Sequence, residues 1–336
     1  MGLKVIIENN IPFAKGLLDE YADVSYLSPR DITREAMASA DALITRTRTR
    51  CDASLLEGSR CSIIASATIG LDHVDMDYCR NRGIKVVNAP GCNAPAVAQY
   101  VFASVFSVLG RDISDIVLGV VGVGHVGSIV ERWGRLLGME VLLCDPPRAY
   151  AEGGNGFVSL DEIARRADVI TFHIPYTTRG EYATRHICDS RFLHTLSRRP
   201  VIINSSRGAV ADTAALLQAH EEGIVGNLVI DCWENEPDID RRLLEVAAVA
   251  TPHIAGYSRE GKVRATTMAV SAVARHFGLP QPVMPESVPS GAADRVSVET
   301  IMASYDPLVD TEVLRRDPQL FEWLRNNYNL RGEVRG

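Results

Sequence analysis

The sequence predicts an α/β protein of two domains, each built on a parallel sheet, with a short extension at the C-terminus. Two observations predict this fold. Short apolar segments with strand character alternate with helical segments through most of the chain, which is typical of βαβ units and parallel sheets. The length of 336 residues is also about twice that of a domain of roughly 150 residues.

The first quarter of the chain contains four short apolar segments that we interpret as strands. They are 3–8, 42–46, 62–68 and 84–88. A helix is expected at 72–83, between the last two of them. This order of elements predicts the first parallel sheet.

The segment 95–110, PAVAQYVFASVFSVLG, is apolar nearly all round, which predicts a buried helix. It lies in the longest charge-free window, 86–110, whose length raises the alternative of a membrane span. The window contains Asn88, Pro90, Asn93, Pro95 and Gln99. Because these residues would leave polar groups unsatisfied in lipid, we predict a strand, a turn and a buried helix instead.

The segment 116–124 is a continuous apolar strand that ends in glycines, as expected for a strand covered on both faces. A helix at 126–137 and a strand at 140–145 complete one βαβ unit. Further strands are expected at 168–173, 200–206, 227–233 and 248–253. Further helices are expected at 160–166, 212–222 and 259–277.

These elements predict three parts of the chain. Residues 96–254 form one domain, and residues 1–95 with 255–280 form the other. Residues 281–336 form a linker and a C-terminal segment, because 278–291 is rich in Pro and Ser and such composition is typical of linkers.

The charge composition indicates which kinds of molecule the protein is expected to bind. The 35 Lys and Arg against 42 Asp and Glu give a net charge of −7, so nucleic acid is not the expected partner. A local arginine cluster could still hold a small anionic substrate. The N-terminus MGLKVIIENN does not resemble a signal peptide, and no membrane association is expected.

The seven cysteines are odd in number, widely spaced and without a CxxC pair. This pattern predicts reduced thiols of a cytoplasmic protein rather than a disulfide framework or a zinc site. No cluster of His, Cys and carboxylate residues has metal-ligand spacing, and we expect no metal.

Three glycines, Gly122, Gly124 and Gly127, form GxGxxG directly after an apolar strand and open a helix. The first permits a tight turn, the second lets a pyrophosphate approach the backbone, and the third allows close helix packing. Asp145 ends the next strand, 21 residues after Gly124, where a carboxylate can bind both ribose hydroxyls and repel the 2′-phosphate of NADP. We therefore predict NAD as cofactor. The alternative is a set of loop glycines with a helix-capping Asp.

Three later segments place polar residues where strands end. They contain Arg207 in 204–212, Glu236 in 231–240 and His253 in 251–260. Ligands of open α/β sheets bind outside the carboxyl ends of the strands. His suits proton removal from an alcohol, a carboxylate can fix its tautomer, and the Arg fork matches a substrate carboxylate. The alternatives are an exposed Arg, a helix-capping Glu and a buried neutral His.

The runs NSSRGAVAD, DCWENEP and TPHIAG resemble the motifs of the NAD-dependent D-2-hydroxyacid dehydrogenase family, and the resemblance covers about residues 1–280. It implies two Rossmann-like domains, one flavodoxin-like and one NAD-binding, with a cleft between them. It also implies that Arg207 binds the substrate carboxylate and polarises the C2 oxygen. His253 is then the acid/base, and Glu236 pairs with its imidazole.

Other runs resemble the branch of this family that oxidises 4-phospho-D-erythronate in bacterial pyridoxal phosphate (vitamin B6) biosynthesis. They are ENNIPFA, ATIGLDHVD, APGCNAPAVAQYV, CDPPRA and TPHIAGYSREGKVRATT. The implied substrate contacts are Arg46, Thr47, Thr68 and Tyr257. The implied NAD contacts, beyond the glycines and Asp145, are His125, Val126, Ile174, Ser205, Ser206, Asp231 and Gly256.

The arginines at 46, 48 and 50 alternate at a strand end, so we expect them to share one face and to serve a phosphate; a solvated basic edge is the alternative.

This branch carries a C-terminal dimerisation domain. Only 292–336 remain here, and FEWLRNNYNLRGE resembles part of that domain, so a homodimer is the expectation.

Two alternative functions remain open. One is a dehydrogenase of glycerate, 3-phosphoglycerate or glyoxylate, and the other is a dinucleotide-sensing corepressor.

Overall fold

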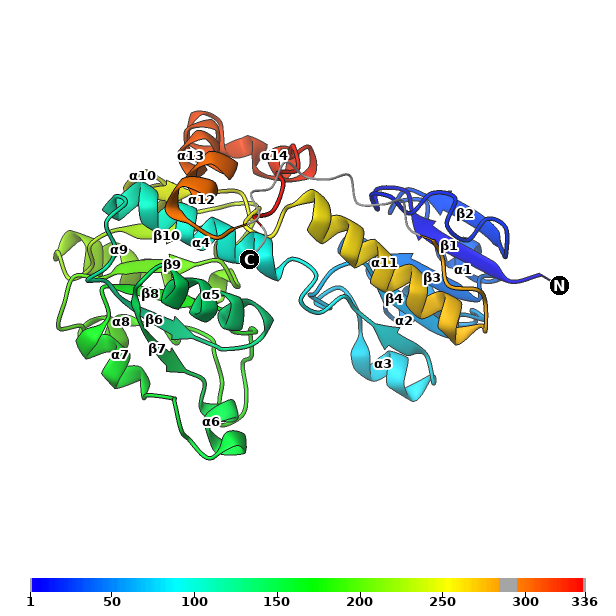
Figure 1. Cartoon of the computed structure of the whole chain (residues 1–336). Coiled ribbons are helices and arrows are strands. Elements are labelled where there is room, and N and C mark those ends of the chain that lie inside the picture. The colour runs from blue at the N-terminus through cyan, green and yellow to red at the C-terminus, as the bar shows by residue number, and fades with distance from the viewer. Residues whose placement is uncertain (1, 284–294, 335–336) are drawn as a thin grey trace. The chain divides into compact units, whose positions relative to one another are not determined.

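The computed structural model describes residues 2–283 and 295–334. The chain forms two compact units, Met1–Asn93 with Arg259–Ser290 and Ala94–Ser258 with Gly291–Gly336. Most of the Pro- and Ser-rich segment that we interpret as a linker lies outside the described residues. Each unit contains one parallel sheet covered by helices (Figure 1), which confirms the predicted α/β class.

The first unit contains a five-stranded parallel sheet in the order β2-β1-β3-β4-β5, which is the flavodoxin-like order. Its strands are β1 (Lys4–Glu8), β2 (Asp23–Leu27), β3 (Ala42–Thr45), β4 (Ile63–Ser66) and β5 (Lys85–Val87). Its helices are α1 (Arg34–Met37), α2 (Ala53–Leu56), α3 (Met76–Asn81) and α11 (Arg259–His276). β3 and β4 are buried along their whole length, as expected for strands covered on both faces.

Two details of the first unit differ from the sequence prediction. β2 was not expected, because it is a partly exposed edge strand that lacks a continuous apolar run. The helix expected from residue 72 begins only at Met76, since the Asp75 carboxylate accepts a hydrogen bond from the Tyr78 N–H at 2.9 Å and caps α3 there.

The second unit contains a six-stranded parallel sheet in the order β11-β10-β9-β8-β6-β7. Its strands are β6 (Val117–Val121), β7 (Glu140–Cys144), β8 (Val169–Phe172), β9 (Val201–Asn204), β10 (Leu228–Ile230) and β11 (Val249–Ala250). Its helices up to residue 258 are α4 (Ala94–Leu109), α5 (His125–Leu136), α6 (Pro146–Glu152), α7 (Leu160–Arg166), α8 (Ser190–Leu193), the 3₁₀ turn η1 (Gly208–Val210), α9 (Thr213–Glu221) and α10 (Arg241–Val246).

Alternate residues of the strands of this unit enter two different cores. Leu118 and Val120 of β6 pack with α4 and α5, whereas Val117 and Val121 pack with the cluster that includes α7 and α9. The chain order reverses between β6 and β8, since β7 lies on one side of β6 and the later strands on the other. Ligands of such sheets bind at this switch point, outside the carboxyl ends of the strands.

The C-terminal segment, residues 295–334, is part of the second unit (Figure 1). It consists of α12 (Val298–Ser304), α13 (Pro307–Arg316), the 3₁₀ turn η2 (Pro318–Leu320) and α14 (Phe321–Asn326). Leu314 and Phe321 are fully buried in its core. The Ala250 N–H of edge strand β11 donates to the Thr311 hydroxyl at 3.0 Å, so α13 covers a sheet edge that would otherwise be open.

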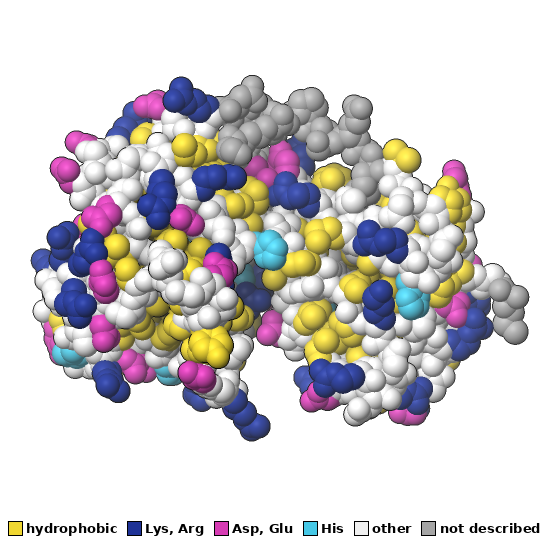
Figure 2. Space-filling view, turned by 60° about the horizontal axis from the view of Figure 1, so that its bottom comes forward, with side chains coloured by type: hydrophobic (Ala, Val, Ile, Leu, Met, Phe, Trp, Pro, Cys, Tyr) yellow, Lys and Arg dark blue, Asp and Glu magenta, His cyan; other side chains and the backbone are white. Residues whose placement is uncertain are grey.

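Twelve of the sixteen residues of α4 are buried, in agreement with the predicted buried helix. No helix among the described residues has both the length and the apolar character that a membrane crossing requires. Figure 2 shows acidic and basic side chains interspersed over the visible face rather than separated by sign.

Candidate active site

The glycine-rich turn connects β6 to α5, and its three glycines differ in their surroundings. Gly122 has φ +89°, and a Cβ there would lie 2.5 Å from the Ile174 side chain. A Cβ on Gly127 would lie 2.0 Å from the Gly122 carbonyl oxygen, whereas one on Gly124 would meet nothing within 4 Å. Gly124 is also the N-cap of α5. The open space beside Gly124, at a helix N-terminus, therefore fits a dinucleotide pyrophosphate.

Asp145 joins this turn to the end of β7. Its carboxylate accepts hydrogen bonds from the Val123 N–H at 2.8 Å and from the Arg148 N–H at 3.1 Å. The second bond caps α6, so the helix-capping alternative is present in the structure. A carboxylate has about four acceptor positions, and these two bonds leave capacity for ribose hydroxyls. Capping and ribose binding are therefore compatible.

The Asp145→Asn variant tests the cofactor role of this residue. Asn still caps a helix but does not repel a 2′-phosphate, so we expect the ratio of kcat/KM for NADP to that for NAD to rise at least about tenfold. Steady-state kinetics with both cofactors measure this ratio, and an unchanged thermal midpoint serves as the folding control. A ratio equal to that of the wild type would contradict the assignment.

The other residues with an implied cofactor role lie in the second unit, in the segments that follow its strands. They are His125 and Val126 after β6, Ile174 after β8, Ser205 and Ser206 after β9, Asp231 after β10 and Gly256 after β11. The Ser205 hydroxyl is buried without a hydrogen-bond partner among the described residues. An unsatisfied buried hydroxyl at this position fits a site that a ligand completes.

Asp231 is buried and fixes the loop that follows β11. Its carboxylate accepts hydrogen bonds from the Ile254 N–H at 2.7 Å, the Ala255 N–H at 3.0 Å and the Thr251 hydroxyl at 2.7 Å. These bonds hold His253 at φ +57°, a left-handed conformation that is uncommon for residues other than glycine. Such strained positions cluster at functional sites.

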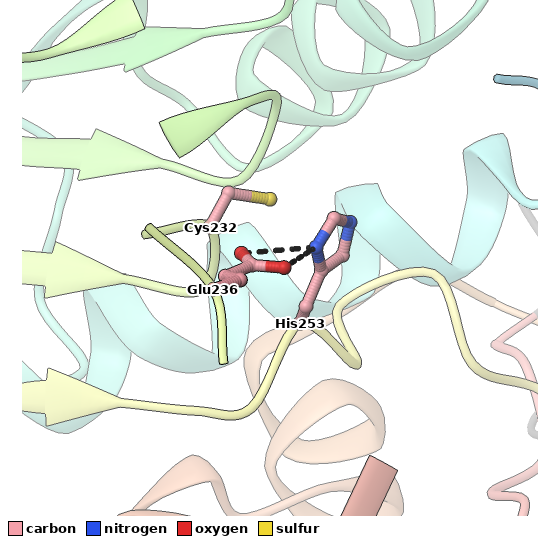
Figure 3. A group of neighbouring side chains, drawn as sticks. All are labelled: Cys232, Glu236 and His253. Carbon is pink, nitrogen blue, oxygen red and sulfur yellow. Dashed lines mark hydrogen bonds and ion pairs between the residues drawn. The ribbon is translucent and has the colours of Figure 1, made fainter. Parts of the chain in front are cut away.

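The pairing of Glu236 with His253 is the centre of the candidate site (Figure 3). His253 Nδ1 lies 2.8 Å from Oε2 and 3.1 Å from Oε1 of Glu236. Burial pushes the pKa of Glu236 up, but the His253 charge, the hydrogen bonds from His253 and the Trp233 N–H, and the Arg325 charge outweigh it and leave that pKa below its usual value. An ionised carboxylate only accepts hydrogen bonds. Nδ1 therefore carries a proton, and in the neutral form of the imidazole Nε2 is left to accept one.

Cys232 is a third member of this group that the sequence analysis did not identify. One potential ligand atom from each of Cys232, Glu236 and His253 lies within 4.8 Å of the other two (Figure 3). Burial, with the charges of Asp231 and Glu236, raises the pKa of the Cys232 thiol well above its usual value. A metal would bind the thiolate form of Cys232, which this burial disfavours.

Arg207 belongs to the loop after β9 and lies beside the Glu236 loop. A Cβ on Gly208 would lie 1.9 Å from the Trp233 carbonyl oxygen, which shows how closely the two loops approach. The buried Asn204 amide ties them together, since it donates to the carbonyls of Arg207 at 2.9 Å and Cys232 at 3.4 Å. The structure thus brings Arg207 to the same edge of the sheet as Glu236 and His253.

The implied substrate contacts are divided between the units. Arg46, Thr47 and Thr68 belong to the first unit and Tyr257 to the second. Buried Glu8, at the end of β1, accepts hydrogen bonds from the backbone N–H groups of Arg46 at 3.1 Å and Thr49 at 3.2 Å. Glu8 therefore positions the loop after β3. In the sequence, Glu8 is recognisable only as an acid at the end of an apolar strand.

The expectation that the arginines at 46, 48 and 50 share one face of a strand is wrong. β3 ends at Thr45, and the residues that follow turn instead of extending. Arg50 pairs with Asp52 at 2.7 Å, and its side chain is 84% exposed. Arg50 thus follows the alternative of a solvated basic edge.

Comparison of the sequence and fold with known proteins identifies the class of enzyme to which this chain belongs. Residues 96–255 match the NAD-binding domain of D-isomer specific 2-hydroxyacid dehydrogenases. The D-lactate dehydrogenase of Aquifex aeolicus, solved with NAD and lactic acid, is 27% identical with a TM-score of 0.70, covering 82% of this chain and 96% of that one. The NAD-bound 3-phosphoglycerate dehydrogenase of Entamoeba histolytica shares the fold at 22% identity, a TM-score of 0.70, and 85% and 99% coverage. The fold and site therefore define an NAD-dependent dehydrogenase of this class.

Two relatives identify one family within this class of dehydrogenases. The erythronate-4-phosphate dehydrogenase of Bacteroides thetaiotaomicron is 45% identical over 98% of this chain and 97% of that protein. That of Porphyromonas gingivalis is 41% identical over 97% of this chain and 92% of that protein. The chain belongs to the erythronate-4-phosphate dehydrogenase family.

Proposed function

We propose that this protein oxidises 4-phospho-D-erythronate to (R)-3-hydroxy-2-oxo-4-phosphobutanoate with NAD, as a step of pyridoxal phosphate biosynthesis. The observation that carries the proposal is the Glu236–His253 pair at 2.8 Å beside Arg207, in a chain 45% identical to an erythronate-4-phosphate dehydrogenase over almost its full length.

Each of the three residues has a role that its geometry supports. His253 Nε2 accepts the proton of the substrate hydroxyl, while the Glu236 carboxylate holds the Nδ1–H and stabilises the imidazolium that forms. Arg207 binds the substrate carboxylate through its two-donor fork and polarises the C2 oxygen. NAD, when bound, supplies the acceptor for the C2 hydride. The hydroxyl proton and the hydride together account for both electrons and both hydrogens that the alcohol loses.

The remaining assignments follow from the same proposal. The substrate is contacted by Arg46, Thr47, Thr68 and Tyr257. NAD is held by Gly122, Gly124, His125, Val126, Gly127, Asp145, Ile174, Ser205, Ser206, Asp231 and Gly256. We further propose that the enzyme acts in the cytoplasm as a homodimer; the seven free and buried cysteines support a reducing compartment.

An NAD-reduction assay tests the substrate. We expect kcat/KM with 4-phospho-D-erythronate to exceed that with D-3-phosphoglycerate, D-glycerate or glycolate by at least about a hundredfold, because a site built for the longer phosphorylated acid leaves groups unpaired with the others. A preference for one of the other acids would favour a different dehydrogenase of the class. Absence of NADH formation with every acid would favour a dinucleotide sensor.

A further inference from the structure

The C-terminal segment supplies an arginine to the candidate site. In α14, Phe321 is fully buried and so fixes the orientation of the helix. Arg325 follows four residues later and therefore points from the same face. Its side chain is 21% exposed, which is low for an arginine. The resemblance that identified the other site residues did not extend to a role for this position.

Arg325 contacts two residues of the site at once. Its Nε–H donates to the Tyr257 hydroxyl at 3.2 Å, and its Nη1 lies 4.0 Å from Glu236 Oε2. That oxygen is also the nearer acceptor of His253 Nδ1, at 2.8 Å. Glu322, one turn earlier in α14, lies 3.7 Å from the same Nη1 and also holds the guanidinium.

These contacts have two chemical consequences. A cation at 4.0 Å from Oε2 favours the ionised form of Glu236, which is the form that accepts the Nδ1–H of His253. The Arg325 Nε–H also occupies an acceptor position of the Tyr257 oxygen, so it fixes where that hydroxyl group lies.

The same segment holds the loop that carries His253 and Tyr257. Arg331 is buried and donates to the carbonyls of Ile254 at 3.1 Å and Ala255. Its guanidinium also lies 4.3 Å from the centre of the Tyr305 ring. The Ser258 hydroxyl donates to Glu333 at 2.6 Å. Arg325 therefore contacts Tyr257 from a segment that also holds residues on both sides of Tyr257.

We propose that Arg325 is a positioning residue of the dehydrogenase reaction, which holds the Glu236 carboxylate toward His253 and holds the Tyr257 hydroxyl group in place. The inference rests on the proposed function, because it assigns Arg325 to the site of that reaction. The competing explanation is that Arg325 only anchors the C-terminal segment to the second unit.

Arg315 provides a matched control for anchoring. It lies in the same segment and donates to the carbonyls of Leu244 at 3.3 Å and Glu245 at 3.4 Å, and to that of Ala247. Its partners are thus backbone groups around the end of α10. Arg315→Met removes the hydrogen bonds that attach the C-terminal segment near the end of α10. Arg325→Met instead removes the contacts with Tyr257 and Glu236.

The experiment compares Arg325→Met, Arg325→Lys, Tyr257→Phe, the double variant Arg325→Met/Tyr257→Phe, and Arg315→Met. For each full-length protein, kcat and KM for 4-phospho-D-erythronate, the Kd of NAD and the thermal midpoint are measured. We expect Arg325→Met to lower kcat/KM at least about tenfold, with the Kd of NAD within about twofold of wild type and a thermal midpoint no lower than that of Arg315→Met. Arg325→Lys should recover part of the loss, since it restores the charge without the planar fork.

The double variant separates positioning from anchoring. If Arg325 acts through the Tyr257 hydroxyl, the losses of the two single variants do not multiply in the double variant. The inference is overturned if those losses multiply, if Arg315→Met loses as much activity as Arg325→Met, or if Arg325→Met behaves as wild type. If the wild type oxidises a different D-2-hydroxy acid, the proposed substrate is wrong and the same comparison with that acid still tests Arg325. A wild type that oxidises no hydroxy acid contradicts both proposals.

Discussion

The His253→Ala variant is expected to lose at least about a hundredfold in kcat for hydroxy acid oxidation, which is typical for removal of a general base. His253 is the residue whose Nε2 is free to accept a proton while Nδ1 is held by Glu236 at 2.8 Å. Alanine leaves no group to take the hydroxyl proton as the hydride departs. The rate of NADH formation at saturating substrate measures this loss of kcat.

A second His–Glu pair in the same unit offers a close control. His186 Nε2 lies 2.7 Å from Glu234 Oε1, and its side chain is 28% exposed, against 26% for His253. The two pairs are alike in chemistry and burial, but only the one at the end of β11 is assigned to catalysis. We expect His186→Ala to keep kcat within about threefold of wild type. A near-normal rate in His253→Ala, or an equal loss in both variants, would contradict the assignment.

The Arg207→Ala variant is expected to lose at least about a hundredfold in kcat/KM, through both a higher KM and a lower kcat. The higher KM reflects the lost carboxylate contact, and the lower kcat reflects the lost polarisation of the C2 oxygen. Arg207→Lys should recover little of this loss, since an ammonium is a point charge and cannot form two parallel bonds to a carboxylate. Steady-state kinetics over a range of substrate concentrations separate the two parameters.

Arg198→Ala is the matched control for the loss of a cation. Arg198 precedes β9 at the opposite end of the strand from Arg207, and its guanidinium pairs with Asp168 at 2.8 Å with the side chain half exposed. We expect its kcat/KM to stay near that of wild type. Wild-type kinetics in Arg207→Lys would show that charge alone suffices, and wild-type kinetics in Arg207→Ala would remove the residue from the substrate site.

Features that depend on neighbouring residues were predictable from the sequence. The apolar run, the three glycines and the following helix lie within 117–136, so their strand, turn and helix are specified locally. Arg207, Glu236 and His253 are far apart in the chain, but each follows a strand of one parallel sheet. Because such strands end at a common edge, their approach could be expected without coordinates.

Features that depend on exposure or capping were harder to predict. β2 lies at the edge of its sheet and needs no continuous apolar run. The arginines after β3 leave the strand at Thr45, because buried Glu8 accepts hydrogen bonds from the backbone of the loop. The alternating charges of that stretch gave no indication of this distant carboxylate.

The sequence by itself determined the α/β class, and it predicted the dinucleotide-binding turn and the three residues of the proposed chemistry, since each rests on local periodicity or on a motif at a strand end. Only the tertiary structure decided that Cys232 joins the Glu236–His253 pair, and that Arg325 reaches Tyr257 from 68 residues away. Such contacts are set by how the C-terminal helices pack on the second sheet. This packing is driven by buried apolar residues such as Leu314 and Phe321. Their apolar character predicts that the helices pack against the sheet, but it does not indicate which polar residues become neighbours.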